Sequence, residues 1–169
     1  FDGLSLTISE GDRVGVIGPN GAGKTTMLRI LSGAEDPDEG EIHRRRLLRV
    51  AMVSQDDTFD PESTVIEVAT RGAALDAEAV EDETDRQVRV AIALDQLGFQ
   101  RPEQAVGELS GGWRKRLAIA AALAADPEIL LCCHLTSGAA GYPDVVATLN
   151  GSVVATEAQT LTQVRRLFD

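Results

Sequence analysis

The sequence lacks long apolar runs, scattered cysteines and an excess of basic charge. None of its apolar runs reaches the roughly 18 residues of a membrane span, and no signal peptide is recognisable. The 16 basic residues are outnumbered by 27 acidic ones, so the net charge of -11 argues against a broad basic surface for nucleic acid. Its two cysteines are the neighbours Cys132 and Cys133, which excludes a disulfide framework and favours a reducing, cytoplasmic setting.

What is present is an ordinary globular composition. The 169 residues are 43% hydrophobic and 25% charged, which suits a single domain with a sizeable core. The first residue is Phe1 rather than Met, so we expect the chain to begin inside a longer protein. Strand–loop–helix units predict an α/β fold.

Short apolar or alternating segments predict strands, and longer periodic ones predict helices. Strands are predicted at "LSLTIS" (4–9), "RVGVIG" (13–18), "GEI" (40–42) and "RVAMVSQ" (49–55). Helices are predicted from Thr64, then over "VRVAIALDQLG" as far as Gly98, and then after "LSGG". Pro127 marks a turn before the strand "EILL".

Two charged clusters interrupt these elements. The basic stretch "HRRRLLR" (43–49) favours a solvated turn over an RNA contact. An acidic group predicts an exposed helix face or a mobile connection. Its members are Asp76, Glu78, Glu81, Asp82, Glu83 and Asp85.

The stretch "GPNGAGKTT" follows a predicted strand and precedes a predicted helix. Its glycines permit backbone angles at which successive N–H groups curl around an anion, and the helix adds its positive end. The spacing is that of a phosphate-binding loop, in which Lys24 contacts the β- and γ-phosphates and Thr25 offers a hydroxyl to Mg²⁺. The phosphate-binding residues predicted here are Gly18, Pro19, Asn20, Gly21, Ala22, Gly23, Lys24, Thr25 and Thr26.

A second glycine pair opens the later helix. In "LSGGW" (109–113), Ser110 is a good N-cap, and Gly111 and Gly112 leave backbone N–H groups unshielded. A plain capped helix would explain the segment alone, but the upstream phosphate loop favours a phosphate-facing role. Trp113 is either a residue characteristic of one branch of a protein family or a hydrophobic anchor for the helix.

Over about 1–131, these motifs resemble the ATP-binding cassette (ABC) ATPases. "GPNGAGKTT" is similar to their phosphate loop, "VSQDD" with Gln55 to their glutamine loop, and "LSGG" to their signature. Trp113 after the signature and the long opening stretch are especially similar to the ABC-F branch, whose members act on ribosomes. The resemblance implies an α/β P-loop NTPase fold with a mostly parallel core sheet, a small antiparallel β part and a helical subdomain at about 64–125.

The resemblance also implies roles and partners. Gln55 would contact Mg²⁺ and the attacking water, with a polar residue at the end of a strand as the less favoured alternative. The signature would face a nucleotide held by a second cassette, in the same longer chain or in a dimer. The implied function is binding and hydrolysis of ATP with Mg²⁺ by an ABC-F-like, ribosome-associated domain without membrane insertion. The alternatives are the nucleotide-binding subunit of an ABC transporter and an inactive nucleotide-binding module or gene fragment.

The pattern fails after Leu131. The family's strand ends in Asp-Glu, but Cys133 and His134 stand at these positions. A thiol is a poor Mg²⁺ ligand, His134 could act as a base, and buried cysteines on a strand are the favoured interpretation. Segment 132–169 has five charged residues among 38, lacks the closing histidine of the family and is predicted to be a degenerate or truncated end. Its "SVVATE" (152–157) is similar to a remnant of the strand before that histidine, but it is not assigned to the core. A truncated or misassembled gene product is favoured over an inactive cassette or one completed by another chain.

Overall fold

The computed structural model describes residues 3–16, 19, 21–54, 58–74 and 82–133, and the backbone alone at 152–156. Two compact units make up the chain: unit 1 is Phe1–Gln55 with Glu128–Asp169, and unit 2 is Asp56–Pro127. The elements of unit 1 are β1 (Arg13–Val16), α1 (Lys24–Ser32), β2 (Val50–Val53), β3 (Ile129–Cys132) and β4 (Ser152–Thr156). Those of unit 2 are α2 (Val65–Ala73), α3 (Glu83–Gln96), the 3-10 helix η1 (Val106–Glu108) and α4 (Gly111–Ala124).

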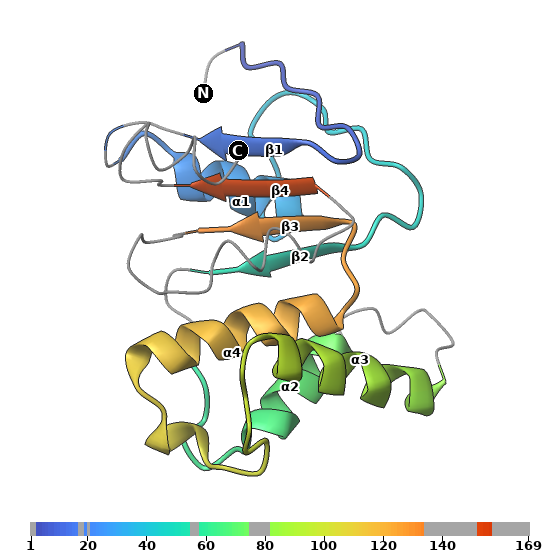
Figure 1. Ribbon diagram of the computed structural model, residues 1–169. Helices are drawn as coiled ribbons and strands as arrows, with labels where there is room; N and C mark the ends of the chain where they lie inside the picture. The colour runs from blue at the N-terminus through green and yellow to red at the C-terminus, as the bar shows by residue number, and fades with distance from the viewer. Residues whose placement is uncertain are drawn as a thin grey trace. The chain divides into compact units, whose positions relative to one another are not determined.

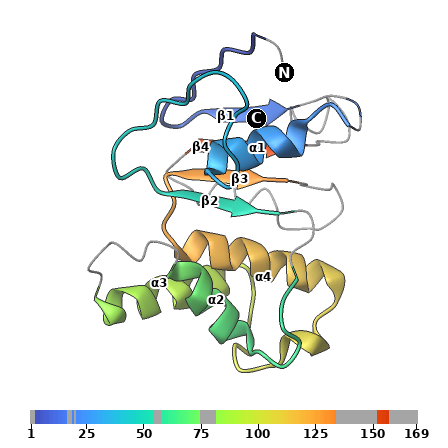
Figure 2. The same cartoon turned by 180° about the vertical axis from the view of Figure 1, so that it is seen from behind.

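Unit 1 is built on a parallel sheet with the strand order β1-β4-β3-β2 (Figure 1). Val16 pairs with Thr156, and Cys132 pairs with both Ala155 and Val53. The carboxyl ends of the strands therefore meet at one edge of the sheet, which is where open parallel sheets bind ligands. Helix α1 lies against one face of the sheet, as the view from behind shows (Figure 2).

The hydrophobic core of unit 1 lies between α1 and the sheet. Met27 and Leu28 of α1 pack with Leu131 of β3 and with Cys133, and all four are buried. Leu28 is fully buried, so its contribution is of the order of 1.5–3 kcal/mol. This packing fixes the start of α1 relative to the ends of the strands.

Strand β4 corrects one expectation. The sequence does not assign "SVVATE" to the core, yet Ser152–Thr156 pairs with β1 on one side and β3 on the other. A strand with a neighbour on each side is held in place by long-range hydrogen bonding rather than by its own pattern. Residues 152–156 thus lie inside the sheet, between β1 and β3.

Two predicted strands are wrong. Residues 4–9 and 40–42 are described, and neither segment forms a strand. Alternation predicted the first, but a strand needs a second backbone to complete its ladder. Leu4 and Leu6 are 56% and 45% exposed, and of this apolar side only Ile8 packs against the core of unit 1. No antiparallel β part is formed by the described residues beyond a single bridge between Thr64 and Ala105.

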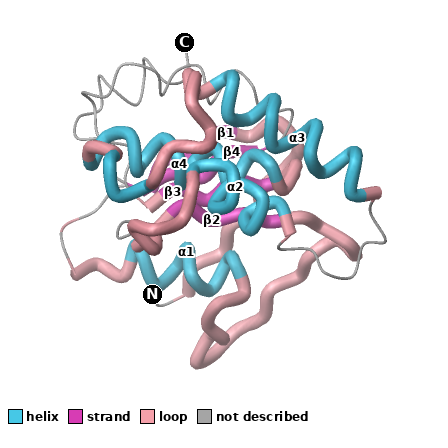
Figure 3. The backbone as a smooth tube through the Cα atoms, turned by 90° about the horizontal axis from the view of Figure 1, so that it is seen from below, coloured by secondary structure: helices cyan, strands magenta, loops and turns pink. Residues whose placement is uncertain are grey.

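Three helices pack together in unit 2 (Figure 3). Helix α2 begins at a capping box, in which the Thr64 hydroxyl accepts from Glu67 N–H and the Glu67 carboxylate accepts from Thr64 N–H. Helix α3 ends before Gly98, whose φ of 82° suits glycine, as predicted. The middle of α4 is buried on all sides, with every residue from Leu117 to Ala122 buried. No described helix has the length and apolar composition that crossing a membrane would require.

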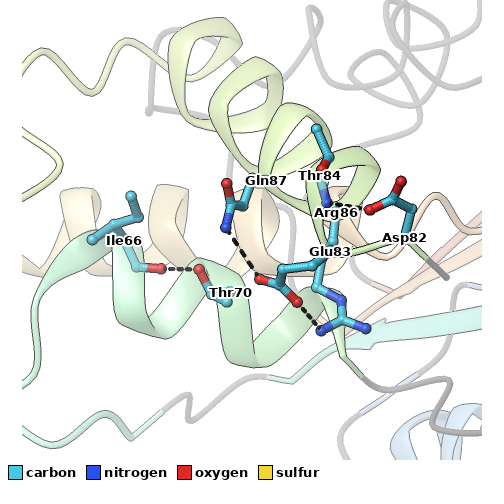
Figure 4. Close-up of polar contacts among 7 residues, drawn as sticks. All are labelled: Ile66, Thr70, Asp82, Glu83, Thr84, Arg86 and Gln87. Carbon is cyan, nitrogen blue, oxygen red and sulfur yellow. Dashed lines mark hydrogen bonds and ion pairs between the residues drawn. The ribbon is translucent and has the colours of Figure 1, made fainter.

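The start of α3 is a polar, solvated helix end. The Asp82 side chain accepts a hydrogen bond from Thr84 N–H, and Glu83 accepts from both Arg86 and Gln87 (Figure 4). Carboxylates at a helix amino end complement the positive helix dipole. Asp82, Glu83 and Asp85 are exposed, which confirms a solvated helix face for this half of the acidic cluster. Its other half, at 76–81, lies outside the described residues.

The basic stretch 43–49 is an exposed turn over most of its length, as predicted. The Arg44 guanidinium donates to the carbonyl oxygen of Ile30 near the end of α1. Arg45 forms an ion pair with Glu128, whose carboxylate also accepts from Arg49 N–H. At least two of these arginines, Arg44 and Arg45, therefore form contacts within unit 1.

Candidate nucleotide-binding site

The phosphate loop, Gly18 to Thr26, connects β1 to α1. Gly21 and Gly23 have φ values of 82° and 83°, in the left-handed region that residues with a side chain rarely adopt. The amide of Ala22, between them, donates to the carbonyl oxygen of Pro19 at 3.1 Å, which closes a tight turn. The glycine spacing thus produces the compact backbone turn that it predicts. Gly18 and Asn20 lie outside the described residues.

Lys24 is the first residue of α1, and its side chain is directed back to the loop. Its ammonium group donates a hydrogen bond to the Pro19 carbonyl oxygen at 3.0 Å, and the residue is only 8% exposed. A buried ammonium group exerts a stronger field than one in water. The contact holds this charge inside the turn, where a phosphate oxygen could replace the carbonyl as acceptor.

The amino end of α1 is open to an anion. Gly23 is the N-cap and provides no side-chain hydrogen bond, and the first turn contains no acidic residue. The first amides of a helix have no intrahelical acceptor, and the helix dipole makes this end positive. Thr25 and Thr26 are exposed, so the Thr25 hydroxyl is accessible beside the loop. Backbone amides, one ammonium group and one hydroxyl together suit a polyphosphate.

Two further predicted residues follow strands that end at the same edge. Gln55 comes two residues after β2, and His134 comes two residues after β3. Both lie outside the described residues, so their roles stay predictions. Cys133 is described and buried, and its N–H donates to the Val53 carbonyl oxygen at 2.9 Å.

The signature opens α4 in unit 2. Ser110 is the N-cap, as predicted, with its hydroxyl accepting from Trp113 N–H at 3.5 Å. Ser110, Gly111 and Gly112 are all exposed. A Cβ atom on Gly111 or Gly112 would meet no atom within 4 Å, so a ligand can approach the backbone closely there. The signature is thus an exposed, positive helix end suited to an anion outside unit 2.

Trp113 packs on residues that the sequence did not connect with it. Its ring lies edge-on to Phe99, with 5.1 Å between ring centroids, and the Arg116 guanidinium lies 4.8 Å from its centroid. Trp113 remains 37% exposed. This arrangement supports the hydrophobic-anchor interpretation, because the ring braces the first turn of α4 against the end of α3.

A set of backbone hydrogen bonds joins the entry of α2 to the segment before the signature. Val65 and Ile66 N–H donate to the carbonyl oxygens of Gln104 and Pro102, and Val106 N–H donates to Ser63. The first amides of α2 thus find acceptors outside their own helix. The pattern Thr64-x-x-Glu67 is a sequence signal that could have located this helix start, but the partner segment cannot be deduced from it.

Comparison with known proteins identifies the family. The model of the ABC transporter family matches residues 1–134. This chain belongs to the ABC transporter family. The match includes the phosphate loop, Gln55 and the signature, so the resemblance expected from these motifs is confirmed at the level of the family.

Curated relatives of this cassette are ATP-binding proteins named for transport. A Nod factor export ATP-binding protein I from Burkholderia orbicola is 38% identical over 151 residues, which covers 81% of this chain and 48% of the relative. The sulfate/thiosulfate import ATP-binding protein CysA of Vibrio cholerae is 38% identical over 143 residues, covering 76% of this chain and 37% of the relative. The cassette therefore spans about half or less of the length of these relatives.

Solved structures confirm the fold class. A dimeric ATP-binding cassette in a post-hydrolysis state, bound to ADP and Pi, matches with a TM-score of 0.81 at 26% identity, covering 96% of this chain and 80% of that one. An archaeal ribosome recycling factor, aABCE1, matches with a TM-score of 0.67 at 29% identity, covering 93% of this chain and 31% of that one. The α/β P-loop fold of the ABC cassette is thus shown. The curated relatives are transporter-type proteins and give no support to the ABC-F branch specifically.

Proposed function

We propose that this chain is the ATP-binding domain of an ABC transporter, the alternative that the relatives support better than an ABC-F role on the ribosome. The observation that carries the proposal is the phosphate loop. Buried Lys24, the left-handed Gly21 and Gly23, and the open amino end of α1 together form a polyphosphate-binding turn.

Each part of the loop would act on a different part of the ligand. The backbone amides would donate to the phosphate oxygens, and the dipole of α1 would favour their negative charge. Lys24 would exchange the Pro19 carbonyl for a phosphate oxygen without leaving the turn. The loop contacts phosphates alone, so the preference for ATP over other nucleoside triphosphates comes from the family.

The signature would complete a second site rather than its own. Ser110, Gly111 and Gly112 are exposed at a positive helix end, and in this family the signature faces the nucleotide of an opposing cassette. The proposed working unit is therefore a pair of cassettes with nucleotides between them. The dimeric cassette among the structural neighbours supports this arrangement.

The transporter proposal does not extend to a cargo. One relative is named for export of Nod factors and another for import of sulfate and thiosulfate, at the same 38% identity. Relatives that share the cassette to this extent carry names with unrelated cargoes. The proposal is therefore limited to the energy-coupling role of the nucleotide-binding subunit.

Two observations favour the ribosome-associated alternative. The sequence "LSGGW" and the match to a ribosome recycling factor both favour it. Sedimentation separates the two candidates, with the chain expressed in cells and lysates fractionated into membranes and ribosomes, each with and without ATP. We expect the chain in the membrane fraction. ATP-dependent recovery with ribosomes, and none with membranes, would favour the alternative.

A further inference from the structure

We infer that the nucleotide site of this chain binds ATP without help from Mg²⁺, because an apolar cluster occupies the position from which a strand would supply a metal ligand. The inference rests on the proposed function, since it concerns the same site. It starts from Cys133, which directly follows β3 at the edge of the sheet where β1 leads into the phosphate loop.

The side chain of Cys133 belongs to the core of unit 1. It is 2% exposed and packs with Met27, Leu28 and Leu131. Leu131 and Cys133 are two residues apart and share one face of the strand, the face covered by α1. The hydrogen bond from Cys133 N–H to Val53 extends the ladder of β3 and fixes that orientation. Turning the thiol out of the cluster would open a cavity beside α1.

The residues around this position do not fit Mg²⁺. Mg²⁺ requires near-octahedral coordination by oxygen and releases its waters reluctantly. A thiol is a soft ligand, and this one is enclosed by methionine and leucine side chains. Among the described residues, no three His, Cys, Asp or Glu side chains gather where they could hold a metal ion. Of the two predicted Mg²⁺ contacts that remain, Thr25 supplies a neutral hydroxyl and Gln55 a neutral amide, so neither brings negative charge to attract the ion.

The anion-binding part of the site does not depend on oxygen ligands for a metal ion. Its binding groups are backbone amides, the positive end of α1 and Lys24, all of which act on the phosphates directly. Free ATP carries more negative charge than its Mg²⁺ complex, so these groups attract it at least as strongly. ATP affinity should consequently be insensitive to Mg²⁺.

The test is calorimetric titration of ATP into the whole 169-residue chain, once in EDTA and once in excess MgCl₂. We expect dissociation constants that agree within about fivefold, a difference of about 1 kcal/mol. Tightening by Mg²⁺ of fivefold or more would overturn the inference and leave the proposed function standing. Absence of ATP binding in both buffers would overturn the proposed function, and the inference with it.

A thiophilic ion checks the orientation of Cys133 separately. The titration is repeated with CdCl₂, on the unsubstituted chain and on Cys133→Ala, with Cys132→Ala as the matched control from the opposite face of the strand. We expect Cd²⁺ to leave ATP affinity unchanged in all three proteins. Tightening by Cd²⁺ that disappears in Cys133→Ala alone would mean that the sulfur reaches the ion, and would overturn the inference.

Discussion

A Cβ atom placed on Gly72 would lie 2.6 Å from both the Cβ and the carbonyl oxygen of Ala121, because α2 and α4 approach closely at this pair. Real Cβ atoms do not approach other atoms so closely, so the two helices could not keep this separation with any larger residue at 72. Gly72 is therefore a packing residue of unit 2, although glycine inside a helix is unfavourable by itself.

The first prediction follows from this contact. Gly72→Ala should lower the free energy of unfolding by about 1–3 kcal/mol, because overpacking outweighs the gain in helix propensity. Gly112→Ala is the matched control, since its Cβ would meet nothing within 4 Å in α4. Urea denaturation measures both variants. Equal stability of Gly72→Ala and Gly112→Ala would contradict the close approach.

The second prediction concerns the anchor of the signature helix. Trp113 and Phe99 form an edge-on pair, and such pairs contribute about 0.5–1.5 kcal/mol beyond the area they bury. A double-mutant cycle with Phe99→Ala and Trp113→Ala should therefore show a coupling free energy in this range. Strictly additive losses in thermal or urea unfolding would show that Trp113 does not hold α4 through Phe99.

The third prediction concerns the start of α2. Thr64→Ala removes the hydroxyl that accepts from Glu67 N–H, so the free energy of unfolding should fall by about 1 kcal/mol. Thr64→Ser keeps the acceptor and should retain most of that stability. The comparison is made by urea denaturation at one temperature. If the alanine and serine variants were equally stable, the cap would have no energetic role.

Local backbone chemistry made the phosphate loop predictable from sequence. Gly21 and Gly23 adopt left-handed angles because the turn requires them, and Lys24 lies where the spacing places it. Gly98 marks the end of α3 for the same reason. Such features depend on a few neighbouring residues, so a short stretch of sequence determines them.

Features that depend on distant partners could not be predicted in this way. Residues 152–156 form β4 because β1 and β3 supply hydrogen-bond partners on both sides, which no local pattern reveals. Residues 4–9 have the alternation of a strand but no partner strand among the described residues. The contact of Trp113 with Phe99 likewise depends on how α3 and α4 pack.

The binding of ATP by Lys24→Ala tests the central claim most directly. Lys115→Ala is the matched control, because it removes the same charge from the only other lysine of the chain. Lys24→Met keeps part of the buried stem, and circular dichroism establishes that each variant is folded. We predict that both Lys24 variants bind ATP at least about tenfold more weakly than the unsubstituted chain, while Lys115→Ala binds normally. Unchanged ATP affinity in folded Lys24→Ala would contradict the account.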